Sequence, residues 1–207
     1  MPDGGLFEDI KRYLPKYLSP GDSSELFAQL ASYPRATSPF YLQGVVLPDE
    51  PLQGDGWRGF VAIDFQTADR KEVSGVVISN SCDIDPANRR DRAVNILFSP
   101  LIALSKYVDL LRQVKTNAQI ENVLTAIRDQ RMTSIFHLPA DAWGPEGIVL
   151  LDTIHAQPLD HFLAKERARL FTLSQYAFYI FLMKLSIHFT RMQEDVRRFD
   201  RPEPVGA

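Results

Sequence analysis

Two apolar, β-branched segments joined by a short polar turn constrain this fold more than any other feature. The first, at 58–66, reads RGFVAIDFQ, and the second, at 72–80, reads EVSGVVISN. Alternate residues of the first segment fall on opposite faces, which predicts a strand with one buried face. The run at 76–78 is apolar on both faces, which predicts a strand inside a sheet. We therefore expect a sheet built around this hairpin.

The rest of the chain predicts helices around that sheet. Further strands are expected at 40–47, 93–98, 134–138 and 147–154, and helical spacing runs from 100 to 132 with a break at 116–117. A capping-box pattern at 172–175 predicts a long last helix. Because the strands cluster before residue 98, we expect an α+β domain. We expect one domain over 1–207, with a helical arm at 1–34, a barrel at 38–155 with a helical insertion at 100–132, and C-terminal helices at 158–199.

Composition narrows the classes of function. A net charge of −3 gives no overall attraction to nucleic acid, so such contact needs a local basic patch. The N-terminus lacks the order of a signal peptide, and no apolar run is long enough for a membrane span. We expect a cytoplasmic protein without membrane contact. The single cysteine, Cys82, excludes an intrachain disulfide and a cysteine-based zinc cluster. No metal or cofactor is expected.

The polar segment after the second strand is the first candidate site. Cys82 lies there, followed by Asp83, and both are candidate catalytic residues together with Arg90. A reactive thiolate needs a basic partner, which only the fold could bring from His137, His155, His161 or His188. The alternative interpretation, which we prefer, is that Cys82 is a small filler in the structure.

The charged groups near this segment also have two interpretations. Asp83 and Asp85, with Asp64 across the hairpin, could hold a hard cation, but Asp in a turn more often bonds its own backbone. The pair Arg89 and Arg90 could contact phosphate or an acidic protein surface, or form a solvated, salt-bridged loop. The candidate binding residues are Ser79, Asn80, Ser81, Asp85, Arg89 and Arg90.

The aromatic run at 176–181 makes the last helix apolar around most of its girth. Such a helix is buried on more than one side. It either packs centrally against the sheet or is partly covered by a second subunit. A homodimer is therefore expected as one possible assembly.

The segments GFVAID at 59–64 and VISN at 77–80, with a following strand that closes at 99–101, resemble the opening of the MazF/PemK-like fold. The likeness covers about a fifth of the chain. The segment 79–83 is also similar to a Ser-x-x-Cys-Asp motif found in uncharacterised bacterial proteins. The resemblance implies a small antiparallel SH3-like β-barrel, here with inserted helices and a long C-terminal helix.

The resemblance also implies a bacterial toxin–antitoxin context. The endoribonuclease toxins of the MazF/PemK-like group typically carry Arg-Pro just before the second strand and a threonine at a Pro-Leu/Ile-Thr strand end. At the matching positions this chain reads EVSG at 72–75 and SPLI at 99–102. The chain thus lacks both the arginine that would stabilise the charge developing on the phosphate during RNA cleavage and the threonine hydroxyl. We therefore predict a binding or regulatory module that contacts protein or RNA through residues 79–92. The alternative is an enzyme, either a toxin-like endoribonuclease with rearranged residues Asp83, Arg89 and Arg90, or a Cys82-dependent hydrolase.

Overall fold

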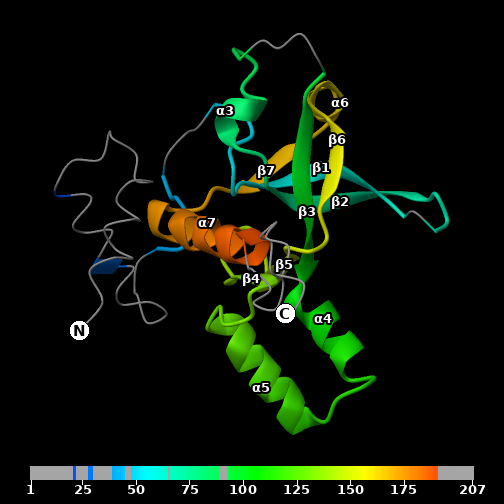
Figure 1. The fold of residues 1–207 in the computed structure, drawn as a ribbon, viewed down its shortest axis with the longest axis vertical. Coiled ribbons are helices and arrows are strands. Elements are labelled where there is room, and N and C mark those ends of the chain that lie inside the picture. Colours follow the sequence, from blue (N-terminus) through cyan, green and yellow to red (C-terminus); the bar gives the residue numbers. More distant parts are fainter. Residues whose placement is uncertain are drawn as a thin grey trace, which may run out of the picture.

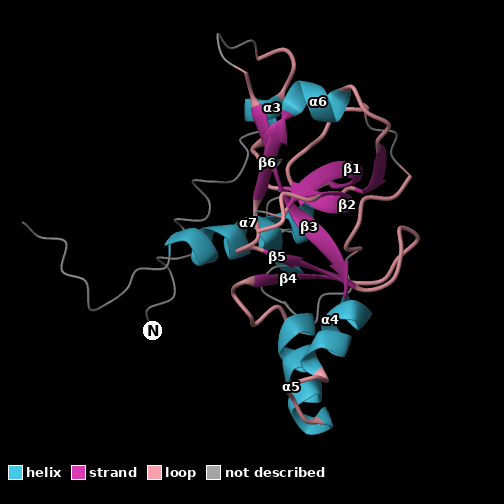
Figure 2. Ribbon diagram, turned by 90° about the vertical axis from the view of Figure 1, so that its right-hand side faces the viewer, coloured by secondary structure: helices cyan, strands magenta, loops and turns pink. Residues whose placement is uncertain are grey.

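The architecture is α+β, with a seven-stranded antiparallel sheet and several helices packed around it (Figures 1 and 2). The structure, a computed structural model, describes residues 39–44, 48–64, 66–88 and 93–190, together with residues 21, 28 and 29. The strands are β1 (Gly56–Ile63), β2 (Arg70–Val77), β3 (Asn95–Ala103), β4 (Ile135–Leu138), β5 (Gly147–Leu150), β6 (His155–Pro158) and β7 (Ala168–Phe171). The helices are α3 (Ser81–Ile84), α4 (Leu104–Leu111), α5 (Asn117–Arg128), α6 (Leu159–Leu163) and α7 (Gln175–Thr190).

β1 and β2 form the predicted hairpin, although each strand begins two residues earlier than expected. The register shifts between Arg58 and Phe60, where Gly59 adopts a φ of +107°. A bulge inserts one extra residue into a strand and so changes the face of the residues beyond it. Trp57 and Phe60 can therefore both enter the same core cluster, although three positions separate them.

β3 is the central strand of the sheet, and its partners change along its length. Residues 95–98 pair with β6, residues 98–100 with β2, and residues 101–103 with β5. The sequence predicted a strand that ends at 98 and a helical pattern from 100. That boundary is wrong, because the strand continues through Pro100 to Ala103 and α4 begins at Leu104. The predicted break at 116–117 is confirmed, and Thr116 caps α5 with a complete capping box.

The sheet does not close into a barrel within the described residues. Its hydrogen-bonded path runs β4-β5-β3-β2-β1-β7, with β6 beside β3, and the end strands β4 and β7 are not paired with each other. A side chain links β6 to β1, since Val61 N donates to Gln157 Oε1 at 2.9 Å. The group β6-β3-β2-β1 is therefore curled, and one glutamine joins its two outer strands.

Three hydrophobic clusters form the core. In the first, α7 packs on β4 and β5, with the rings of Phe181 and Phe136 5.1 Å apart. The second lies in the curl of β1, β2 and β3 under α6, where Phe60 stacks at 4.1 Å on Phe98 and at 4.4 Å on Phe162. The third joins α4 and α5 to β4 and β5. These two helices form a pair that projects from one end of the sheet (Figure 2).

The outer edge of β4 is covered by side chains rather than by another strand. The Gln130 side chain donates to His137 O at 2.7 Å and accepts from His137 N at 3.0 Å, as a neighbouring strand would. The buried ammonium of Lys184, on α7, donates to Met132 O at 2.7 Å and also to Ile135 O. Unpaired strand edges attract other chains, and this edge is blocked against such pairing.

Other predicted elements differ from the structure. Within the predicted strand 40–47, only Tyr41 forms a bridge, to Leu173, and residues 45–47 lie outside the described part. Residues 168–171, expected among C-terminal helices, form β7 beside β1. The helical arm predicted at 1–34 falls almost wholly outside the described residues. No helix in the described part of the chain is both long and apolar enough to cross a membrane.

Candidate functional site

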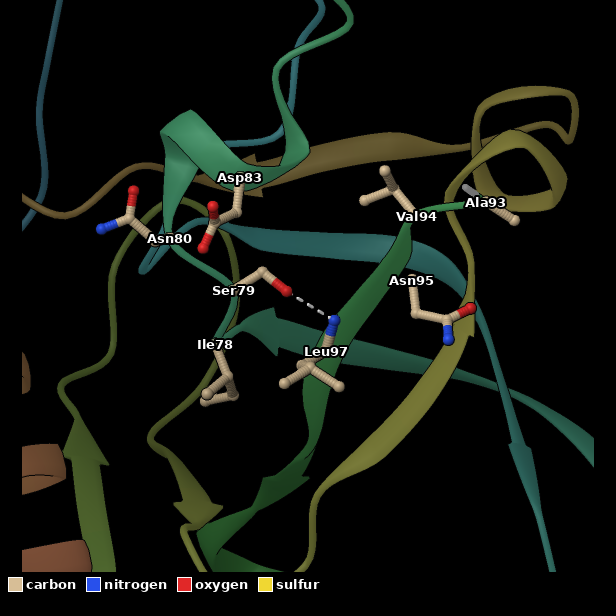
Figure 3. A pocket seen from close by; sticks show the side chains of 8 residues that line it. All are labelled: Ile78, Ser79, Asn80, Asp83, Ala93, Val94, Asn95 and Leu97. Atoms are coloured by element: carbon tan, nitrogen blue, oxygen red, sulfur yellow. Dashed lines mark hydrogen bonds between the residues drawn. The ribbon is translucent and has the colours of Figure 1, made fainter. Parts of the chain in front are cut away.

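A pocket of about 390 Å³ opens where β2 and β3 diverge, and we call it the α3–β3 pocket (Figure 3). One wall comes from the end of β2 and from α3, and the other comes from the start of β3. The Asp83 side chain points from α3 toward the end of β2, and Val94 and Leu97 lie on the opposite wall (Figure 3). The lining residues are Ile78, Ser79, Asn80, Asp83, Ala93, Val94, Asn95 and Leu97.

Ser79 explains why the strands part at this point. The last regular pair of β2 and β3 is Val77 with Phe98. Beyond it, Ile78 N donates to Leu97 O at 2.8 Å, and Leu97 N donates to Ser79 Oγ at 2.8 Å. The hydroxyl replaces the backbone acceptor of the next pair, which frees the chain to turn into α3.

The polar residues after Ser79 hold the short helix α3. Asn80 is its N-cap, and its Oδ1 accepts from Cys82 N at 2.9 Å. Ser81 Oγ accepts from Gln53 N at 2.9 Å. The predicted polar turn is thus one turn of helix, whose cap and neighbouring loop are fixed by these side chains.

Asp85 and Asn88 fix the backbone that follows α3. Asp85 Oδ1 accepts from Ala87 N at 2.7 Å, and Asn88 Nδ2 donates to Cys82 O at 2.8 Å. Asp64 plays the same part in the β1–β2 turn, where its Oδ1 accepts from Gln66 N at 2.8 Å. The described residues contain no group of three or more His, Cys, Asp or Glu side chains placed to hold a metal ion.

Cys82 is exposed on α3, so the preferred interpretation of this residue as a small filler in the structure is wrong. Its backbone is hydrogen-bonded on both sides, but no hydrogen bond of the described residues involves its thiol. All four histidines lie in the described part, and His137 bonds instead to Glu146, with Nε2 and Oε1 3.2 Å apart. A thiolate nucleophile requires an adjacent base, so the hydrolase interpretation has no activating histidine in this arrangement.

The β3 wall of the pocket carries a strand edge that is open among the described residues. Leu159 N donates to Val94 O, so residues 94, 96 and 98 direct their backbone groups toward β6. Asn95 and Leu97 direct theirs toward the pocket. Leu97 is bonded to the end of β2, whereas no described residue pairs with the Asn95 backbone on that side. The Leu97 side chain is 39% exposed beside it.

Arg89 and Arg90, the basic candidates of the sequence, lie outside the described residues. The structure brings the remaining candidate residues together. Ser79, Asn80 and Asp83 line the pocket, while Ser81 and Asp85 support the backbone around it.

Nothing in the sequence indicated a buried ion pair that joins the residue before β1 to β7. Asp55 is fully buried, its Oδ2 lies 3.2 Å from Arg169 Nε, and the Trp57 indole donates to the same oxygen at 3.3 Å. Burial raises the pKa of Asp55, against the lowering effect of its hydrogen bonds and of Arg169. The Arg169 guanidinium lies 4.7 Å from the Trp57 ring centroid. Asp55 and Arg169 are far apart in the chain, and no local pattern marks them as partners.

A second missed group joins α5 to the β4–β5 turn. Arg128 binds Glu146 through two hydrogen bonds, of 3.0 and 2.8 Å, and these hold the pKa of Glu146 below its usual value. Burial lowers the pKa of His137, against the raising effect of Glu146. The contacts among Arg128, Glu146 and His137 therefore connect the α4–α5 pair to the sheet.

No protein-family model matches the sequence, and no curated protein matches it. The resemblance to MazF/PemK-like proteins stays a prediction.

Proposed function

We propose that this protein is a binding module without catalytic activity, which takes an extended peptide segment in the α3–β3 pocket. The observation that carries the proposal is the backbone edge of Asn95, which no described residue pairs with, within a pocket of about 390 Å³. An extended peptide can add to such an edge through main-chain hydrogen bonds, and pockets beside the edge then select its side chains.

The chemistry of the pocket fits a peptide. Its apolar residues, Ile78, Val94 and Leu97, can cover one apolar side chain of the ligand, and the polar residues flank them. The polar groups of Ser79 and Asn80 are already engaged in backbone hydrogen bonds. Side chains that already hydrogen-bond the backbone help to fix the shape of the pocket, and they are poorly placed to act as an acid, a base or a nucleophile.

The curl of the sheet bears on the SH3-like barrel that the sequence resemblance implies. We propose that the curled group β6-β3-β2-β1, joined by Gln157, corresponds to the SH3-like barrel that the sequence resemblance implies. The α4–α5 pair is then an addition to that unit. A cytoplasmic location and a homodimer also stay predictions.

The test is selection from a random peptide library, followed by calorimetry with the selected synthetic peptides. We expect Leu97→Asp to weaken binding about tenfold or more, because an anchor side chain in a contact typically contributes at least about 1.4 kcal/mol. The matched control is Leu110→Asp, at a leucine of α4 that is 60% exposed and lies outside the pocket. Both variants should give the circular dichroism spectrum of the wild type.

Two outcomes would contradict the proposal. In one, no selected peptide loses affinity in Leu97→Asp relative to Leu110→Asp. In the other, the purified protein cleaves RNA or hydrolyses a model ester, and Cys82→Ala or Asp83→Asn abolishes that activity while leaving the fold unchanged. The second outcome would restore the enzyme interpretation.

A further inference from the structure

A second pocket, of about 250 Å³, lies on the sheet and is separate from the α3–β3 pocket; we call it the Arg58 pocket. Its floor crosses β1, β2 and β3, and its walls come from α4, β7 and the loop before β5. The lining residues are Arg58, Ser74, Leu101, Ala103, Lys106, Trp143, Pro145, Gly147 and Leu170.

The pocket has two cationic side chains and no acidic one. Arg58 lies on β1, directly opposite Ser74 on β2, and Lys106 comes from α4. Both are exposed, and neither forms an ion pair or a side-chain hydrogen bond with a described residue. The nearby carboxylate of Glu146 is occupied by Arg128 and His137. Two cations that no described carboxylate compensates, placed around one concave surface, favour an anion.

The opposite wall is apolar and held in place. Trp143 sits in a turn closed by two hydrogen bonds between Asp141 and Gly144, of 3.1 and 3.0 Å. Its ring lies 5.0 Å from the Phe171 ring and 6.0 Å from the Tyr41 ring. A Cβ added to Gly147 would lie 3.0 Å from the indole, so the glycine makes room for this ring. A ring fixed in this way contacts a ligand at little conformational cost.

We propose that the Arg58 pocket binds a small organic anion with a planar ring, such as an aryl carboxylate or an aryl phosphate. The anionic group meets Arg58 and Lys106, with the Ser74 hydroxyl as a further hydrogen-bonding group, and the ring meets Trp143 and Leu170. The pocket is below the range of about 300–1,000 Å³ typical of drug-sized ligands, which restricts it to compact molecules.

Tryptophan fluorescence provides a direct test, because the chain has two tryptophans and the other one, Trp57, is fully buried. Full-length protein is titrated with benzoate and phenyl phosphate, and with benzamide and inorganic phosphate as probes that lack the charge or the ring. We expect a saturable change in fluorescence with the two aryl anions, and its loss in Trp143→Phe. Calorimetry on Trp143→Phe then shows whether the anion still binds.

Variants of the cations complete the test. Arg58→Gln and Lys106→Gln should each weaken phenyl phosphate binding about tenfold or more, as expected for loss of a charged hydrogen bond. The matched controls, Arg70→Gln and Lys115→Gln, change exposed cations outside the pocket and should leave binding unchanged.

Several results would overturn the proposal. They are an absence of saturable binding, equal binding of benzamide and benzoate, equal binding of inorganic and phenyl phosphate, or equal effects of pocket and control variants. Tighter, Arg58-dependent binding of a short RNA would replace the small anion with a nucleic acid. None of these results bears on the peptide site, since the two pockets share no residue.

Discussion

Asp55 and Arg169 show how a single ion pair can fix a loop in this protein. The carboxylate lies in the core, and the guanidinium that faces it also donates to the carbonyls of Pro48 and Glu50, at 2.6 Å each. A buried charge that loses its partner is costly, typically by about 3–5 kcal/mol. Arg169 therefore both compensates Asp55 and anchors the segment before β1.

We predict that Arg169→Leu lowers the free energy of unfolding by about 3–5 kcal/mol at pH 7. Because burial raises the pKa of Asp55 above its unfolded value of 3.8, the folded state keeps the proton to higher pH than the unfolded state. Stability from this group therefore increases as the pH falls through the folded-state pKa. Arg169 lowers that pKa, so its removal raises the pKa of Asp55 further, and the folded variant takes up the proton at higher pH than the wild type does. The loss should therefore be smaller at pH 5 than at pH 7. Urea denaturation at both pH values measures it.

Two controls accompany the Arg169 variant. Adding Asp55→Asn to Arg169→Leu should recover part of the lost stability, because the uncompensated charge is gone. Arg112→Ala removes an exposed pair with Asp109 and should cost less than about 1 kcal/mol. If Arg169→Leu costs no more than Arg112→Ala, the pair does not hold this loop.

Residue-level contacts such as these could not be predicted from the sequence. The candidates at 79–85 were found because Ser, Asn and Asp after an apolar run predict a turn, and their side chains do bond the backbone there. Arg58, Lys106 and Trp143 gave no signal, because three separate segments bring them together and none carries a motif.

At the scale of elements, edge strand β4 depends on the Lys184 side chain from α7. Burial lowers the pKa of Lys184 to about 8. We predict that Lys184→Met lowers the free energy of unfolding by about 2 kcal/mol or more, since the carbonyls of Met132 and Ile135 lose their donor. Lys115→Met, at an exposed lysine, should change it by less than about 0.5 kcal/mol.

The pH dependence of Lys184→Met has a definite sign. The unfolded state keeps its lysine proton up to 10.5, whereas the folded state releases it at about 8. The unfolded state thus binds more protons between these values, and the stability of the wild type rises with pH there through Lys184. The difference between wild type and Lys184→Met should grow from pH 7.5 to pH 10 in urea denaturation. A constant difference would mean that burial does not perturb this lysine.

Strand and helix patterns were predictable where local chemistry was strong. The β1–β2 hairpin follows from alternation, and the break before α5 follows from its capping residues. The second half of β3 was missed because Leu101 and Leu104 imitate helical spacing and proline is uncommon inside strands. β6 and β7 have four residues each and no regular alternation, so tertiary pairing decides them.

At the scale of the whole molecule, the last helix, α7, carries the surface on which the predicted homodimer can be tested. Its first turns, predicted to be buried on more than one side, are covered by the first core cluster of the chain itself. Exposed apolar side chains occur toward its end, where Ile187 is 52% and Phe189 59% exposed. If the chain forms the predicted homodimer, this end is the best contact surface on α7.

We predict that the double variant Ile187→Asp/Phe189→Asp is monomeric while the wild type is a dimer, as measured by light scattering after gel filtration. The introduced charges would repel each other across a twofold interface. Leu110→Asp/Val114→Asp is the matched control, since Leu110 on α4 and Val114 in the turn after it are also exposed apolar residues. A wild-type protein of monomer mass at every concentration would remove the dimer from consideration.

The changing partners of β3 have a consequence for how the protein unfolds. The strand supplies Ile96 and Phe98 to the second core cluster, while Leu101 packs on the first and Ile102 on the third. Local openings in proteins follow cooperative units. Because all three clusters contact this strand, an opening of β3 itself would disturb each of them. We therefore expect the strands that pair with β3 to unfold together, and the slowest-exchanging backbone amides to be those of β3.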